Sequence, residues 1–217
     1  MNITLNSSDL LKYYVNLVNT NFPDDNRVLE NEIKEYFDFT LQRVEYSFKK
    51  INNKYYFNNG KTTFNHLNGD HNAVLLYYFA NTLFKNDCDR QVCDKLFYLN
   101  RLLHGIDAFY EVELPDVFQL VHPLGTVLGR GKYSNYFTAY QRCGIGSNND
   151  VFPVLGEYVT LRPGASIIGN CQVGNNCEIA AGSLVLDKDL KQNTLYIGNP
   201  KQYYIIKSKR LHPSWIS

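Results

Sequence analysis

One histidine and a few acidic residues are the groups of this sequence best suited to proton transfer. Of its five histidines, only His122 lies between residues 105 and 204. An imidazole titrates near neutral pH, so it can take the proton of a hydroxyl that attacks an acyl group. A carboxylate on its second nitrogen would fix the tautomer and stabilise the imidazolium. The carboxylates that precede it are Asp107, Glu111, Glu113 and Asp116. On the residues alone, His122 is equally a capped histidine at a corner of the chain.

The histidines and cysteines do not predict a metal site. A zinc site of three histidines would need two partners for His122 in the same part of the chain, and none is there. The cysteines show no zinc spacing either: Cys88, Cys93, Cys143, Cys171 and Cys177. We expect no metal, and we expect reduced core cysteines of a cytoplasmic protein.

The fold that must position these groups is indicated by a strict period of six in the apolar residues. The residues that stand six apart are Leu155, Leu161, Ile167, Val173, Ile179 and Val185. A helix period of 3.6 or a strand period of 2 does not explain this spacing, whereas hexapeptide repeats are typical of a β-helix. Three short strands would make one coil of about 18 residues, and each coil would bury its faces against its neighbours. The register is looser from about residue 106 to 150.

The first hundred residues predict helices instead. Apolar stripes at helical spacing follow the cap cluster 7–9 and recur over about 27–50, 70–85 and 90–104, with Gly105 as a C-cap. Residues 51–69 form a turn-rich connection with room for a short hairpin. The predicted fold class is α+β, an N-terminal helical domain followed by a left-handed parallel β-helix. The predicted domains are 1–104 (helical), 105–204 (β-helix) and 205–217 (a C-terminal tail or short helix).

Composition excludes several classes of function. The formal net charge is +1, which gives no electrostatic basis for binding nucleic acid or an anionic membrane. No apolar run reaches the roughly 18 residues of a membrane-spanning helix, and the first residues do not form a signal peptide. We therefore expect a cytoplasmic protein with no membrane span.

Four short motifs lie in order between about residues 70 and 204: GID at 105–107, LVHPLGTVLG at 120–129, IAAGSLVL at 179–186 and GNP at 198–200. Over this range the chain resembles the serine acetyltransferase type of hexapeptide acyltransferase, whose corresponding motifs are GVD, LDHATGVVIG, IGAGSVVL and G-x-P. The most specific match is the segment at 120–129. The family combines a helical domain with a left-handed parallel β-helix, in agreement with the two periodicities above.

The resemblance implies an acetyl-CoA-dependent acyltransferase. It assigns the catalytic base to His122 and the residue that orients this base to Asp107, while the other upstream carboxylates remain alternatives. It also implies that coenzyme A lies along the prism between adjacent subunits of a homotrimer or a dimer of trimers. The small residues suited to contact the coenzyme are Gly164, Ala165, Ala181 and Gly182. Lys201 and Lys188 are candidates for its phosphates.

The departures from the family concern the acceptor. Val121 replaces an aspartate, 150–153 replaces an arginine–histidine pair, and Tyr140-Gln141 replaces a histidine pair. Serine carries two charges that are costly to bury unpaired, whereas aromatic and neutral polar residues suit a sugar ring. Tyr140 and Gln141 are therefore predicted to bind a sugar hydroxyl of a capsular or lipopolysaccharide polymer, with Tyr136 and Phe137 nearby.

Other functions remain open. The first alternative is a serine O-acetyltransferase of cysteine biosynthesis, and an amino sugar acetylated on nitrogen would use the same base. The second alternative is a β-helix that serves only in assembly and has no catalytic activity.

Overall fold

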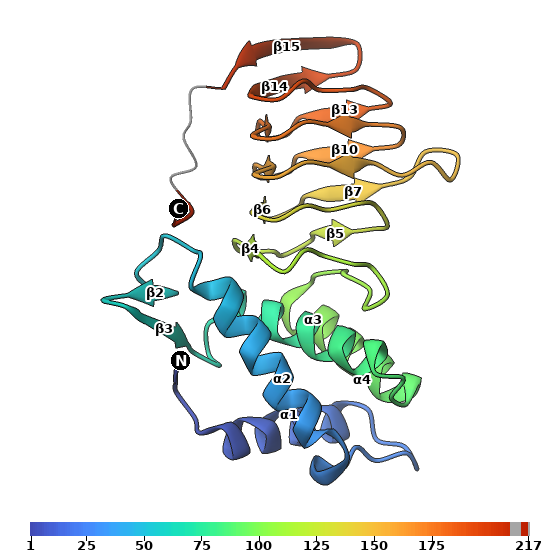
Figure 1. Cartoon of the computed structure of the whole chain (residues 1–217). Coiled ribbons are helices and arrows are strands. Elements are labelled where there is room, and N and C mark those ends of the chain that lie inside the picture. The colour runs from blue at the N-terminus through green and yellow to red at the C-terminus, as the bar shows by residue number, and fades with distance from the viewer. Residues whose placement is uncertain (209–213, 217) are drawn as a thin grey trace.

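The computed structural model describes residues 1–208 and 214–216 of the chain. The N-terminal half is helical, and a parallel β-solenoid stands on the helices (Figure 1). This arrangement confirms the predicted architecture, in which a helical N-terminal region is followed by a parallel β-helix.

The helices begin and end close to the predicted positions. Their bounds are Ser7–Asn21 (α1), Glu30–Phe48 (α2), Gly69–Lys85 (α3) and Arg90–His104 (α4). Asn6, Asn68 and Asp89 cap α1, α3 and α4 by accepting backbone hydrogen bonds, and Gly105 ends α4 at φ 61°. No helix of the described residues has both the length and the apolar character needed to cross a bilayer.

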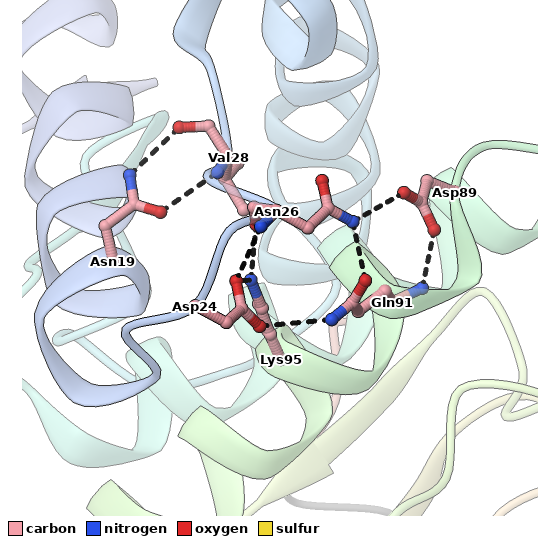
Figure 2. Close-up of polar contacts among 7 residues, drawn as sticks. All are labelled: Asn19, Asp24, Asn26, Val28, Asp89, Gln91 and Lys95. Carbon is pink, nitrogen blue, oxygen red and sulfur yellow. Dashed lines mark hydrogen bonds and ion pairs between the residues drawn. The ribbon is translucent and has the colours of Figure 1, made fainter.

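A buried lysine fixes the loop between α1 and α2 against α4. Lys95 is 6% exposed and donates hydrogen bonds to Asp24 (2.6 Å) and to the carbonyl of Asn26 (2.5 Å) (Figure 2). The Asn26 amide also donates to Asp89 and Gln91 at the start of α4. A buried ammonium is stable only when it is paired, so this network determines the path of the loop.

The connection between α2 and α3 holds the predicted hairpin. β2 (Phe57–Asn58) pairs antiparallel with β3 (Lys61–Phe64). The sequence did not predict the third strand of this sheet, β1 (Asn2–Ile3), which pairs parallel with β3. The N-terminus is thereby tied to the helical domain.

The solenoid is built from short strands in three sheets. Their bounds are β4 (Phe118–Leu120), β5 (Val127–Leu128), β6 (Phe137–Ala139), β7 (Gly144–Gly146), β8 (Val154–Leu155), β9 (Thr160–Leu161), β10 (Ser166–Ile168), β11 (Gln172–Val173), β12 (Glu178–Ile179), β13 (Leu184–Leu186), β14 (Thr194–Asn199) and β15 (Gln202–Lys207). The sheet orders are β13-β10-β7-β5, β11-β8 and β15-β14-β12-β9-β6-β4. β15 runs antiparallel to β14 and ends the stack.

The six hexad residues form the core of the prism. Each is at most 4% exposed. Ile167 lies opposite Val185, eighteen residues along the chain, as the predicted coil length requires. Ile145 lies opposite Ile167, twenty-two residues away, because a loop follows β7 and projects from the stack (Figure 1). The earlier coils also depart from a spacing of eighteen, since Asp107 lies opposite Val127, Phe118 opposite Phe137 and Val127 opposite Gly144. The loop and these departures together make the register loose before residue 150.

The helical domain covers the open end of the first coil. The ring of Phe118 on β4 packs against Tyr77 and Tyr78 of α3, with centroids 5.6 and 5.2 Å apart. Ser47 of α2 donates to the Phe118 carbonyl (3.3 Å). The buried residues form one cluster that runs from the helices into the solenoid. The core is therefore continuous across residue 105, and the division into two domains stays a prediction.

The predicted boundary between the β-helix and the tail, at residues 204 and 205, is wrong, because it falls inside β15 (Gln202–Lys207). Residues 214–216 return to the helical domain, where Trp215 bridges to Ile51 and packs its ring against Tyr136. The remainder of the predicted tail, 209–213 and 217, lies outside the described residues.

A buried histidine on α3 makes stability depend on pH. His71 is 1% exposed, and its Nδ1 accepts a hydrogen bond from the backbone N–H of Asn65 (3.1 Å). Burial lowers the pKa of His71 from 6.5 to about 4. Between these values the unfolded chain binds a proton that the folded chain does not, so stability falls as the pH falls. We expect this group to lower the free energy of unfolding by about 2 kcal/mol between pH 7.5 and pH 5.

Urea unfolding at the two pH values checks this expectation. Phenylalanine at position 71 would fit among the surrounding rings of Phe48, Tyr56 and Phe64 and would remove the titrating group. His71→Phe should therefore lose less stability on acidification than the wild type. An equal loss in both proteins would show that His71 is not responsible. Burial also lowers the pKa of His104, so some pH dependence should remain in the variant.

Candidate active site

His122 stands on the turn that follows β4. The Val121 N–H still pairs with Ala139 of the next coil, and the chain then turns at His122, which has φ 48°. Left-handed backbone of this kind also occurs at Tyr158 and Asn176, so it reflects the corners of the prism more than a special strain. The turn leaves the His122 side chain outside the prism and 79% exposed. The side chain is therefore available to a ligand.

A cavity of about 620 Å³ opens beside His122. Both parts of the molecule contribute to its wall, which is formed by Asn52, Asn53, Tyr55, Tyr56, Asn68, Gly69, Asp70, Gln119, Val121, His122, Tyr140 and Ser214. Val121, one of the departures from the family motif, faces this cavity. Most of the lining residues have neutral polar side chains. Its acidic member is Asp70, and it includes no lysine or arginine among the described residues.

Asp70 is the carboxylate that contacts His122. Its Oδ1 accepts a hydrogen bond from the His122 backbone N–H (2.9 Å) and lies 3.8 Å from the imidazole Nδ1. Burial raises the pKa of Asp70, and the neighbouring His122 acts in the opposite direction. In the sequence, Asp70 is only the first residue of the helix predicted over 70–85. No local pattern indicates a contact between residues so far apart in the chain.

Asp107, the predicted partner of His122, lies beside the segment that follows the 122–125 turn. It pairs in register with Val127, and its carboxylate lies 3.6 Å from Nε of Arg101. Of the other upstream carboxylates, Glu111 contacts Arg90 and Arg130. Within one protomer, the contacts of the described residues therefore connect His122 to Asp70. The role of Asp107 stays a prediction.

The residues predicted for coenzyme A lie on the same edge of the prism as His122. Successive turns at 122–125, 140–142, 162–164 and 180–182 are joined by backbone hydrogen bonds of 2.9 Å, the last of them from Gly182 N–H to the Pro163 carbonyl. Gly164 and Gly182 have φ values of 73° and 68° and stack on each other. A side chain at Gly182 would meet nothing within 4 Å, so the edge is open at this point.

The other predicted coenzyme contacts differ in how accessible they are. Ala181 is exposed on the edge, whereas the side chain of Ala165 is fully buried in the core. Lys201 is exposed in the turn between β14 and β15, at the end of the stack farthest from the helices (Figure 1). Lys188 lies over the Tyr203 ring at the same end. A ligand that touched both His122 and Lys201 would have to extend along the whole edge.

Of the two predicted acceptor residues, the structure places one in the cavity. Tyr140 lines it, and its hydroxyl accepts a hydrogen bond from Arg162 (3.0 Å), which is itself paired with Glu178. Gln141 does not line the cavity, and its buried amide oxygen has no hydrogen-bond partner among the described residues. The ring of Phe137 is in the core, and that of Tyr136 stacks on Tyr158. Neither residue lines the cavity.

Comparison with known proteins gives one family model and a consistent set of relatives. The model for the bacterial transferase hexapeptide (six repeats) matches residues 152–187. A serine acetyltransferase of Synechococcus elongatus is 29% identical over 123 residues, which cover 54% of this chain and 50% of the relative. Serine acetyltransferase 2 of Arabidopsis thaliana is 30% identical over 140 residues, 62% of this chain and 42% of the relative. The chain thus spans about half the length of these relatives.

Solved structures extend the likeness to the whole fold. A serine acetyltransferase of Brucella abortus superposes with a TM-score of 0.70 at 19% identity, covering 94% of this chain and 85% of the other. A serine acetyltransferase in complex with CoA gives a TM-score of 0.70 at 18% identity, covering 93% and 85%. The chain therefore has the fold of the serine acetyltransferases. None of the relatives or structures named here is described as a sugar acetyltransferase.

Proposed function

We propose that this chain is an acetyl-CoA-dependent O-acetyltransferase in which His122 is the general base. The observation that carries the proposal is the position of this exposed imidazole, which faces a cavity at one end of an open edge of small residues. The fold adds support, because proteins of the same fold bear the name serine acetyltransferase and one of them is described in complex with CoA.

The residues of the chain suit the proton transfers of this reaction. Acetyl-CoA would supply the acetyl group as a thioester, and the edge at Gly164, Ala181 and Gly182 would hold the coenzyme. His122 has Nδ1 toward Asp70, which leaves Nε2 to take the proton of the acceptor hydroxyl as its oxygen bonds to the acetyl carbon. The imidazolium then returns this proton to the departing sulfur as the carbon–sulfur bond breaks, so protons and charge balance.

We propose serine as the first acceptor, because every relative and structure named above is a serine acetyltransferase. A sugar hydroxyl is the second candidate, and the charge of the cavity favours it. No lysine or arginine is among the described residues that line the cavity, so the carboxylate of an amino acid would find no cation among those residues. Arg162 approaches Tyr140 but is already paired with Glu178.

We also propose the assembly that the family resemblance implies, a homotrimer or a dimer of trimers. In such an assembly the open edges would lie between adjacent prisms, where a neighbouring subunit can supply further contacts to the coenzyme and the acceptor. Closed rotational symmetry is the usual arrangement of such assemblies.

Release of coenzyme A with a panel of acceptors tests the proposal. The panel contains serine, amino sugars and oligosaccharides, and we expect saturable release above the rate of hydrolysis with a hydroxyl acceptor. Saturation by serine at millimolar concentration or below would identify the first candidate. Turnover of a saccharide with serine at background would identify the second. No release with any acceptor would favour a β-helix that serves only in assembly.

A further inference from the structure

We propose that Asp70 is the positioning residue of His122, holding its backbone and facing its imidazole with a negative charge. This proposal rests on the function proposed above, since it takes His122 as the base. The family resemblance gives that task to Asp107, so Asp70 is an assignment from the geometry of this chain alone.

The position of Asp70 relative to His122 is set by the packing of α3. At the start of the helix, Asn68 accepts hydrogen bonds from the N–H groups of Asp70 (3.0 Å) and His71 (3.3 Å). One to two turns later, the ring of Tyr77 packs on Phe118 of β4. The first turn of α3 is therefore fixed against the strand that leads directly to His122.

One carboxylate oxygen makes both contacts with His122. Oδ1 of Asp70 accepts the His122 backbone N–H at 2.9 Å, which fixes the turn that carries the base. The same oxygen lies 3.8 Å from Nδ1, within the range of an ion pair when the imidazole is protonated. A carboxylate at this position favours the imidazolium that forms while the base holds the proton of the acceptor.

The surroundings strengthen this interaction. The Asp70 side chain is 19% exposed, so water screens its charge less than that of an exposed carboxylate, while the His122 imidazole opposite it is 79% exposed. The other titratable groups that line the cavity are Tyr55, Tyr56 and Tyr140. Burial raises the pKa of Tyr56, which keeps this phenol neutral. No lysine or arginine among the described lining residues competes for the carboxylate.

The test is the pH profile of coenzyme A release in Asp70→Asn. Asparagine keeps an oxygen that can accept the His122 N–H but removes the charge. We expect kcat to fall by about tenfold or more with KM little changed. The acid limb of the profile should move to lower pH, because the imidazolium loses a neighbouring negative charge. Asp70→Glu retains the charge and should keep the acid limb near its wild-type position.

Asp9→Asn is the matched control. Asp9 also lies in the first turn of a helix, hydrogen-bonded to the capping asparagine of α1, and it does not line the cavity. It should leave kcat, KM and the pH profile unchanged. Thermal unfolding of each variant shows whether a loss of activity comes from loss of the fold.

Two results would overturn the assignment. If Asp70→Asn raises KM and leaves kcat and the acid limb unchanged, Asp70 contacts the acceptor and not the base. If Asp107→Asn lowers kcat and moves the acid limb while Asp70→Asn does neither, the family assignment holds.

A second experiment does not depend on activity. The His122 imidazole is titrated by NMR in the wild type and in Asp70→Asn, and its resonance is identified by its loss in His122→Ala. If the titration differs between the two proteins but the wild type has no turnover, the proposed function is rejected and the contact is retained. If the wild type has turnover but the titration does not differ, the contact is rejected.

Discussion

Replacing His122 with alanine is expected to lower kcat for acetyl transfer by about two to four orders of magnitude, the usual contribution of a positioned general base. The fold should remain, because the side chain is 79% exposed and fills no position in the core of the prism. The measurement is coenzyme A release under saturating acetyl-CoA, with thermal unfolding of the same protein as the check on folding.

The left-handed backbone at this position requires a second variant. Asparagine adopts a φ of 48° more readily than alanine does. His122→Asn therefore separates the loss of the base from backbone strain in the turn. Both variants should lose activity to a similar extent. His66→Ala is the control, since His66 lies outside the cavity and bonds to Thr4. A rate near that of the wild type in either His122 variant would remove this residue as the base.

The second large effect is expected in the core of the solenoid. Ile167 is fully buried, with Ile145 opposite it in the coil before and Val185 in the coil after. Ile167→Ala removes apolar contact with both coils and leaves a cavity, because the backbone hydrogen bonds on either side prevent collapse. We expect the free energy of unfolding to fall by about 2 to 5 kcal/mol, as measured by denaturant unfolding.

Ile205→Ala provides the comparison for that loss. Ile205 is also a strand residue, but it lies on β15 at the end of the stack and is 49% exposed. Its replacement should change stability by no more than about 0.5 kcal/mol. If the two substitutions had similar effects, Ile167 would not carry the contacts between coils that we assign to it.

The architecture could be predicted because its main signals are local. A spacing of six puts each of the hexad residues on the inside of the prism, whatever the rest of the chain does. The start and end of α4 could be predicted for a similar reason, since Asp89 and Gly105 act on neighbouring backbone groups. The loop after β7 weakened the pattern, because its insertion shifts the register of the earlier coils.

The partners of the candidate base could not be predicted from the same signals. Asp70 reaches His122 only because α3 packs on the end of the solenoid, and no spacing in the sequence encodes that packing. The motif led to Asp107 instead, which the single protomer places against Arg101. Trp215 reaches Tyr136 through a return of the chain that also has no local pattern.

The acceptor prediction shows the same limit. The sequence identified Tyr140 as a candidate contact, and this residue does line the cavity. It could not show that the ring of Phe137 points into the core or that Tyr136 stacks on Tyr158. Neighbours along a strand point to opposite faces or into corners, so closeness in sequence did not mean a shared surface.

The measurement that tests the central claim most directly is the mass of the acceptor after incubation with acetyl-CoA and the purified protein. Serine and the saccharides of the panel are incubated in parallel with wild type and His122→Ala. We predict that one acceptor gains a single acetyl group on oxygen with the wild type, and that the variant gives this product at a rate lower by about two to four orders of magnitude. Equal product with both proteins, or no acetylated acceptor with either, would contradict the account.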